Sequence, residues 1–307
     1  MKKISFLFFV LIISSESNAL SVLDIKQKGF INCGIILETD NVSSVGKGDV
    51  KKGIFPTFCK ALSVVIFGES DKVNFIDVNY KNSYQKLRDK EIDVLSAPYP
   101  YVYNAKNNDL YFSPPFLYDK VVLLSKVKAE KITEIDNPKI CYGNNFFFKY
   151  DLKKYLGNNN VKYTLEKKDF SNEGCDVFAI NEIYVDKHNN FILKDDITNF
   201  YYNIVTRFED VEISKVVFWT FYSMVRADVL NIKSFDVDEY LKSEDKSLKE
   251  FFDNQDLKNI GLSPNSFYNL IKKIGSYKEV YENHFENFNK YNKSWIDGGL
   301  ILPPPIN

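Results

Sequence analysis

The chain has 307 residues, enough for one or two domains, and its 45% hydrophobic content is sufficient for buried cores. It carries 40 basic and 41 acidic residues, so its formal net charge is −1. This balance excludes the strongly basic proteins that bind nucleic acid through bulk charge, and we expect no nucleic-acid partner.

The first nineteen residues have the pattern of a cleavable signal peptide. Lys2 and Lys3 precede an apolar run over residues 4–13, and Ser17-Asn18-Ala19 follows as a small-x-small cleavage site. The apolar run is shorter than the roughly 20 residues that a membrane-spanning helix needs. The alternative is a retained anchor. We expect residues 1–19 to be removed and the rest to be exported as a soluble protein.

Export changes the interpretation of the four cysteines, because disulfides form in oxidising compartments. Chain order favours the pairs Cys33–Cys59 and Cys141–Cys175, and the alternative is buried free thiols. The sequence has no CxxC motif, and its two histidines lie far apart in the chain. We therefore expect two disulfides, no metal site and no cofactor.

The first half of the chain alternates strand and helix. A polar lead-in at 20–29 is followed by expected strands at 30–36, 72–78 and 92–95, by a loop at 38–53, and by helices at 55–68 and 83–90. Strands separated by helices at this spacing predict a parallel sheet with right-handed crossovers.

Residues 92–127 contain two apolar strands separated by an irregular segment, and the predicted two-lobed fold depends on this stretch. Val94-Leu95 is a short apolar strand, a tyrosine-proline segment without regular period follows, and Val121 to Leu124 is strand-like again. An irregular polar-aromatic loop between two apolar strands is how an open α/β sheet presents a ligand at its strand ends. We interpret this stretch as one wall of a cleft and a crossing into a second lobe.

The second half repeats the theme in a smaller unit and then becomes helical. We expect a helical turn at 132–135, strands at 140–142, 161–165 and 175–180, a helix over 146–156, a return strand at 201–206, and helices at 211–230, 237–253 and 264–274. Two sheet-forming halves joined by two extended segments predict a hinged pair of lobes.

Several segments resemble a known family. They are KGFINCGI at 28–35, FCKAL at 58–62, VIFGESDKVNF at 65–75, IDVLS at 92–96, GCDVF at 174–178, WTFYSMVRADVL at 219–230, IKKIGSYKEVYE at 271–282 and GGLILPPPIN at 298–307. Across the mature chain the sequence is similar to periplasmic solute-binding proteins of polar amino-acid ABC transporters, closest to the general L-amino-acid type. The resemblance implies an α/β, type II periplasmic-binding-protein fold, with lobe 1 at 20–126 and 206–307 and lobe 2 at 127–205.

The resemblance also places the ligand site and shows where it has diverged. The family's threonine and arginine for the α-carboxylate fall on Val102 and Ala105, with Lys106 adjacent, whereas a bidentate contact requires the planar guanidinium. The family's Gly-Thr-Thr-type turn falls on Gly143-Asn144-Asn145. Its acidic residue for the ammonium falls at Asn181, with Glu182 next.

Aromatic residues are further candidates for ligand contact. Tyr99 and Tyr101 alternate with prolines and could stack on a ligand; the alternative is a rigid surface loop. For the run Phe146 to Phe148 we favour core packing at a helix start. The predicted ligand-binding set is Tyr99, Tyr101, Val102, Ala105, Lys106, Asn144, Asn145, Asn181 and Glu182.

Three functions compete. The first is a monomeric periplasmic receptor that delivers a small amino-acid-like ligand to an ABC permease in the inner membrane, the function that the resemblance implies. The second is an enzyme on the same scaffold, against which we note that no histidine lies in the predicted cleft wall and no GxSxG motif is present. The third is a diverged receptor that has lost amino-acid binding and acts as a sensor or protein-interaction module.

Overall fold

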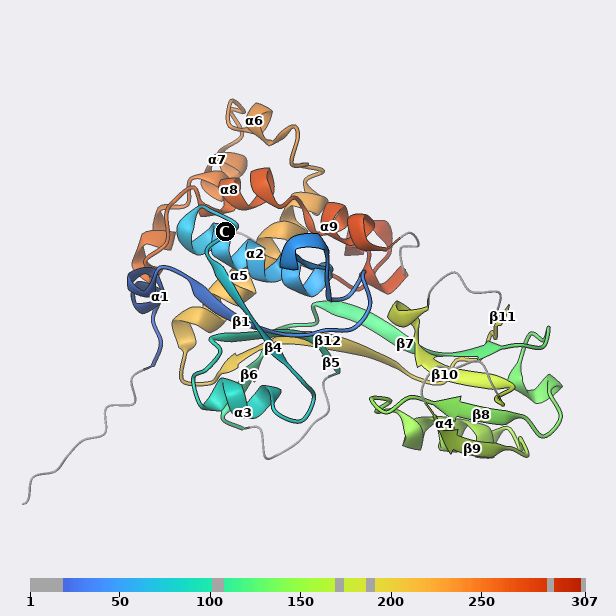
Figure 1. The fold of residues 1–307 in the computed structure, drawn as a ribbon. Helices are drawn as coiled ribbons and strands as arrows, with labels where there is room; N and C mark the ends of the chain where they lie inside the picture. Colours follow the sequence, from blue (N-terminus) through green and yellow to red (C-terminus); the bar gives the residue numbers. More distant parts are fainter. Residues whose placement is uncertain (1–18, 101–107, 169–173, 186–190, 286–289, 305–307) are drawn as a thin grey trace, which may run out of the picture.

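The computed structural model describes residues 19–100, 108–168, 174–185, 191–285 and 290–304. In the described part, two α/β lobes share one curved sheet (Figure 1). The strands of its main path follow the order β4-β1-β5-β12-β7-β10-β8-β9, while β6 pairs with β12 and β11 pairs with β7 at its sides. The larger lobe carries most of the helices (Figure 1).

The strands of the larger lobe are those of the predicted parallel sheet with a few additions. They are β1 Ile31–Ile36, β4 Val73–Val78, β5 Val94–Pro100, β6 Leu110–Phe112 and part of β12 Asn199–Arg207, with a separate hairpin of β2 Ser44–Val45 and β3 Lys51–Lys52. Strand β1 pairs in parallel with both β4 and β5. The smaller lobe holds β8 Lys139–Tyr142, β9 Thr164–Lys167, β10 Val177–Asn181 and β11 Phe191–Ile192. In it, β8 pairs in parallel with β9 and β10.

Strand β7, Leu117–Ser125, belongs to both lobes. Its residues 117–120 pair with β12, and its residues 121–125 pair with β10. Strand β12 in turn pairs with β5 and β6 of the larger lobe. β7 and β12 are therefore the two extended segments that connect the lobes, as Figure 1 shows.

The helices of the larger lobe cover both faces of its sheet. They are α1 Val22–Lys28, α2 Ile54–Phe67, α3 Ser83–Arg88, α5 Val211–Val229, α6 Val237–Tyr240, α7 Lys246–Phe252, α8 Ser266–Lys273 and α9 Tyr277–His284. Helices α2, α5, α8 and α9 enclose the main apolar core, which includes Phe55, Phe116 and Tyr277. Helix α3 covers the opposite face through Leu87. In the smaller lobe, α4 Lys149–Asn158 buries Leu152 and Leu156 against the strands.

The segment 20–29 is a correction to the sequence analysis, which described it as a polar lead-in. It forms helix α1, because Ser21 and Asp24 make a reciprocal capping box and Gly29 ends the helix with φ of 85°. A long helix expected at 237–253 is divided into α6 and α7, and helix α9 was not predicted. The tyrosine-proline segment is also more regular than expected, since β5 continues to Pro100.

The structure pairs Cys33 with Cys59 and Cys141 with Cys175, the pairing that chain order favours. The first disulfide joins β1 to α2 and is buried beside Ile35. The second joins β8 to the residues before β10 and lies in a small core with Val122, Leu124 and Phe178. Each lobe is therefore cross-linked once within itself.

We predict that removing either disulfide destabilises the protein. The cross-links span 26 and 34 residues, and closing loops of this size stabilises a fold by about 3–4 kcal/mol. The double substitution Cys33→Ala with Cys59→Ala should lower the free energy of unfolding in urea by about that amount. An unchanged urea midpoint would contradict a stabilising role. Cys141→Ala with Cys175→Ala is the matched variant for the smaller lobe.

Candidate functional site

The carboxyl ends of the parallel strands in the larger lobe carry polar side chains. Glu38 follows β1 and Tyr80 follows β4. The Tyr80 hydroxyl donates a hydrogen bond to the carbonyl oxygen of Pro98 in β5, at 3.3 Å. Burial raises the pKa of Glu38, while a hydrogen bond from Tyr80 lowers it. Three neighbouring strands therefore bring Glu38, Tyr80 and the Pro98 carbonyl together at one edge of the sheet, where α/β proteins bind ligands.

The carboxyl ends of the parallel strands in the smaller lobe face this edge. Phe147 follows β8 and Tyr184 follows β10. The Phe147 ring lies edge-on to that of Tyr80, with centroids 5.3 Å apart, and the hydroxyl oxygens of Tyr80 and Tyr184 are 3.4 Å apart. Burial raises the pKa of Tyr184 well above its ordinary value. The candidate site is thus the region where the strand ends of both lobes meet, and aromatic side chains from both lobes contribute to it.

A buried carboxyl group lies beside this region, in the first half of β7. Asp119 is 1% exposed and sits just before β7 changes its pairing partner from β12 to β10. It accepts hydrogen bonds from the Tyr202 hydroxyl at 2.8 Å, the Lys120 backbone N–H at 2.8 Å and the Ile183 backbone N–H at 3.3 Å. Asp119 therefore connects both crossing strands to the segment of the smaller lobe that carries Tyr184.

The protonation of Asp119 reflects this burial. Burial raises the pKa of Asp119 to about 7, and the hydrogen bonds from Tyr202, Lys120 and Ile183 hold it down only in part. The nearby carboxylate of Glu182 raises the pKa of Asp119 further. The Asp119 carboxyl group therefore gains or loses its proton near neutral pH, where a small change in its burial or hydrogen bonds changes its charge.

Asn181 and Glu182 lie next to Asp119. Asn181 is 6% exposed, and its amide nitrogen donates to the Tyr202 hydroxyl at 3.1 Å. Its amide oxygen is buried and has no hydrogen-bond partner within the described ranges. The Glu182 carboxylate forms an ion pair with Lys120 at 3.2 Å. Asn181 thus offers a buried acceptor, whereas the charge of Glu182 is already balanced by Lys120.

The other predicted ligand-binding residues lie in β5, in the turn after β8 or outside the described residues. Tyr99 lies in β5, one residue beyond the Pro98 carbonyl that Tyr80 contacts. Tyr101, Val102, Ala105 and Lys106 lie outside the described residues. Asn144 and Asn145 form an exposed turn between β8 and α4, directly before the phenylalanine run.

In that run, Phe146 and Phe148 pack against the cores, and the Phe148 ring stacks on Phe200 at 4.1 Å. The core packing that we favoured therefore holds for these two. Phe147 is 37% exposed and contacts Tyr80 instead.

Sequence analysis missed four residues of this region: Glu38, Tyr80, Asp119 and Tyr184. Three of them come within four residues after a strand of a parallel sheet, so the rule that ligands bind at strand ends could have found them. Asp119 gave no comparable signal, since its burial depends on a segment more than sixty residues later in the chain.

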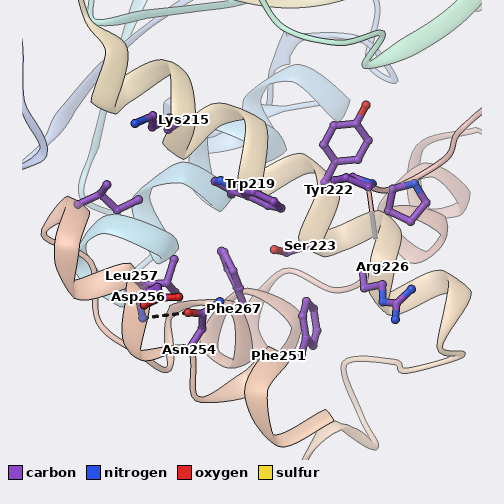
Figure 2. A pocket seen from close by; sticks show the side chains of 13 residues that line it. Lys215, Trp219, Tyr222, Ser223, Arg226, Phe251, Asn254, Asp256, Leu257 and Phe267 are labelled. Carbon is purple, nitrogen blue, oxygen red and sulfur yellow. Dashed lines mark hydrogen bonds between the residues drawn. The ribbon is translucent and has the colours of Figure 1, made fainter. Parts of the chain in front are cut away.

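A separate cavity of about 340 Å³ lies in the helical part of the larger lobe. It is lined by Trp219, Tyr222 and Arg226 of α5, by Phe251 and Phe267, and by Pro303 of the C-terminal segment. Figure 2 shows Trp219 of α5 on one side and Phe267 on the other. None of its lining residues is a predicted ligand-binding residue. It is thus distinct from the region between the lobes.

The described residues contain neither a metal-binding cluster nor a membrane-spanning helix. In these ranges, histidine, cysteine, aspartate and glutamate side chains form no group of three or more suited to a metal ion. No described helix is both long and apolar enough to cross a membrane.

The chain is similar over nearly its whole length to proteins named for amino-acid binding or for a role with amino-acid ABC transporters. It is 25% identical over 324 residues to the general L-amino acid-binding periplasmic protein AapJ of Rhizobium johnstonii, covering 95% of this chain and 94% of that protein. It is 25% identical over 331 residues to the putative amino-acid ABC transporter-binding protein YhdW of Escherichia coli, with 97% and 96% covered. No family model matches the sequence.

Solved structures of the same fold also match. A periplasmic binding protein of an ABC transporter from Brucella ovis, with glutathione bound, superposes with a TM-score of 0.85 over 92% of this chain and 98% of that one, at 21% identity. The ancestral amino acid-binding protein AncCDT-1, a precursor of cyclohexadienyl dehydratase, gives a TM-score of 0.55 over 68% of this chain and 95% of that one, at 15% identity. The predicted similarity to solute-binding proteins and the predicted type II fold are both confirmed.

We predict that Asp119 makes stability depend on pH. Its folded-state pKa of about 7 lies above the ordinary value near 3.9, so the folded state binds this proton more tightly than the unfolded state. Its contribution to the free energy of unfolding is therefore largest below about pH 4 and falls as the pH rises to about 7. The substitution Asp119→Asn should remove this part of the decline in urea titrations.

Burial also raises the pKa of Asp228 to about 7, so Asp228 contributes to the same decline in stability. The effect of Asp119 is therefore measured as the difference between the wild type and Asp119→Asn. Asp253→Asn, on the exposed surface, is the matched control and should leave the decline unchanged. Parallel curves for the wild type and Asp119→Asn across this pH range would show that Asp119 does not titrate there.

Proposed function

We propose that this chain is a periplasmic solute receptor that binds an amino acid or an amino-acid derivative and delivers it to an ABC transporter permease. The observation that carries the proposal is the meeting of strand ends from both lobes around Tyr80 and Tyr184, beside the two crossing strands. The relatives AapJ and YhdW, named as an amino-acid-binding and a putative transporter-binding protein, support the class of ligand and the partner.

The connection between the lobes is compatible with the opening and closing that delivery of a ligand requires. In the described part of the chain, β7 and β12 are the strands that connect the two lobes, so a rotation about them would open or close the region between the strand ends. A ligand that contacts both lobes stabilises the closed form by its differential affinity for that form. A permease that recognises surfaces of both lobes could then distinguish the loaded receptor from the empty one. We take 126/127 and 205/206 as the boundaries between the lobes.

Within that class of ligand, the residue types at the site favour an amino-acid derivative over a free α-amino acid. Position 105, where the resemblance places an arginine, is alanine, and the position expected to bear a negative charge is Asn181. A neutral amide oxygen accepts a hydrogen bond from an amide N–H as readily as from an ammonium, and the tyrosine and phenylalanine rings favour a ligand with flat or apolar parts. Amides of amino acids and short peptides fit this description, and the similar protein from Brucella ovis binds glutathione.

The location and state of the receptor follow from the same proposal. With residues 1–19 removed as a signal peptide, the mature chain is periplasmic, like the relative AapJ, which is named as a periplasmic protein. We propose a monomer without catalytic activity, although a precursor of cyclohexadienyl dehydratase shares the fold. The second candidate is a diverged receptor that senses or binds a protein, and the loss of the arginine at position 105 favours it.

We predict that glutathione or another small peptide raises the melting temperature of the purified protein. A ligand at 100 times its dissociation constant adds about 2.7 kcal/mol of stability, which is about 4–5 °C for a chain of this size. Thermal unfolding with glutathione, the common amino acids, opines and polyamines is the measurement. No shift with any of them would favour the second candidate, and turnover of any of them would favour an enzyme.

Once a ligand is identified, Asn181→Ala should weaken its binding. Loss of one buried hydrogen bond, charged or neutral, corresponds to roughly a 5-fold to 100-fold higher dissociation constant. Titration calorimetry measures it, with the exposed Asn259→Ala as the matched control that should leave affinity unchanged. Equal affinities of the wild type and Asn181→Ala would remove Asn181 from the site.

A further inference from the structure

The first described residues are fixed to the beginning of α5 by two backbone hydrogen bonds. The Leu20 backbone N–H donates to Oδ1 of Asp210 at 2.8 Å, and the Val22 backbone N–H donates to Oε2 of Glu212 at 3.0 Å. Val22 is fully buried in the main core, while Ala19 is exposed. The chain therefore changes from exposed to anchored at the bond between Ala19 and Leu20.

The acceptor at this point is an unusual carboxylate. Asp210 is 0% exposed, and its Oδ2 lies 2.6 Å from Nη2 of Arg207. Arg207 lowers the pKa of this carboxyl through its charge and a hydrogen bond. By strict hydrogen-bond geometry no other donor in the described part of the chain reaches Oδ2, so one of its lone pairs is available. Nη1 of Arg207 donates to the carbonyl oxygens of Leu87 and Ile92, at 2.8 Å each. Burial raises the pKa of Asp210 despite Leu20 and Arg207, so the carboxylate is incompletely compensated.

The same bond is the one that the sequence marks for cleavage. Ser17-Asn18-Ala19 is a small-x-small site, and cleavage after it gives a chain that begins at Leu20. Hydrolysis consumes one water: the C–N bond breaks, the hydroxyl goes to the Ala19 carbonyl carbon, and the hydrogen goes to the Leu20 nitrogen. The new amine then takes up a proton. A neutral N–H that donates one hydrogen bond becomes an ammonium with three donors and a positive charge.

We propose that Asp210 binds the N-terminal ammonium that removal of residues 1–19 creates at Leu20. This ion pair would stabilise the packing of α1 against α5 after cleavage. This rests on the proposed export of the chain. Charge-assisted hydrogen bonds are roughly twice as strong as neutral ones, and Oδ2 of Asp210 has capacity for one. A cation close to the N-terminus of helix α1 would otherwise be unfavourable, because the helix dipole is positive there.

The charged groups around this site agree with the proposal. Asp210 and Glu212 lie on the α5 side, and Asp24 caps α1 on the other. Arg207 is held by Asp210 and by two carbonyl oxygens. Glu209 contributes a further negative charge and pairs with Lys90 at 3.2 Å. The negative groups outnumber the positive ones among these residues, and the ammonium reduces that excess.

The test compares two chains whose only difference is the N-terminus. One begins at Leu20 and the other at Ser17, each released from a cleavable fusion without extra residues. Near neutral pH the chain that begins at Leu20 should melt about 2–4 °C higher. The difference should vanish in the Asp210→Asn background and persist in Glu209→Gln, a neighbouring carboxylate without a contact to Leu20. Equal melting temperatures of the two wild-type chains, or a difference that survives Asp210→Asn, would overturn the proposal.

A pH titration of the two wild-type chains keeps the proposal testable if Asp210→Asn does not fold. Pairing raises the pKa of the ammonium above its ordinary value near 8, so the extra stability is present below that pH and disappears above the raised value. A difference that is constant through this range would count against an ammonium. N-terminal sequencing of the exported chain must also begin at Leu20. No ligand takes part in these measurements, so a negative ligand screen leaves their outcome intact.

Discussion

The hydrogen bonds that Asp119 accepts are the constraint on which the arrangement of the lobes depends. This buried carboxyl group sits in β7 where the strand leaves one lobe and enters the other, and it contacts β12 through Tyr202 and the smaller lobe through Ile183. A buried carboxyl group without such partners would cost several kcal/mol. The two crossing strands and the segment after β10 must therefore keep their places relative to one another.

Near Asp119, the carboxyl ends of parallel strands in one lobe lie opposite the carboxyl ends of parallel strands in the other. Both sheets are parallel near the site, so both present strand ends there, and these ends are rich in aromatic residues. The Tyr80 hydroxyl touches the larger lobe at Pro98 and the smaller lobe at Tyr184. A ligand that enters this region competes with or extends the same contacts, which links ligand binding to the position of the lobes.

Much of the fold could be predicted from the sequence, because apolar periodicity indicates the strands and helices and chain order indicates the disulfide pairs. The strands near 31, 73 and 94 and the helix beginning at Ile54 follow from alternation and helical spacing, and the cysteine pairs follow from lobe membership. Helix α1 was missed because its few apolar residues, Val22 and Ile25, are buried by segments distant in the sequence, among them α2 and Gly261. Its capping box was the available local signal.

The site could be predicted only where resemblance or strand ends point to it. Asn181 and Glu182 came from the resemblance and lie in the region between the lobes. Asp119 could not be found in this way, since an aspartate in an alternating strand looks like a solvated residue until the loop after β10 covers it. The local sequence does not encode that contact, because it joins residues 64 positions apart.

Closure of the two lobes on a small polar molecule between their strand ends can be measured by small-angle X-ray scattering. The protein is measured alone, with glutathione, with mixed amino acids, and with a deproteinised small-molecule extract of the cells that make it. We expect at least one of these additions to lower the radius of gyration and dialysis to restore it. If none of them changes the radius of gyration, the lobes do not close on such a molecule.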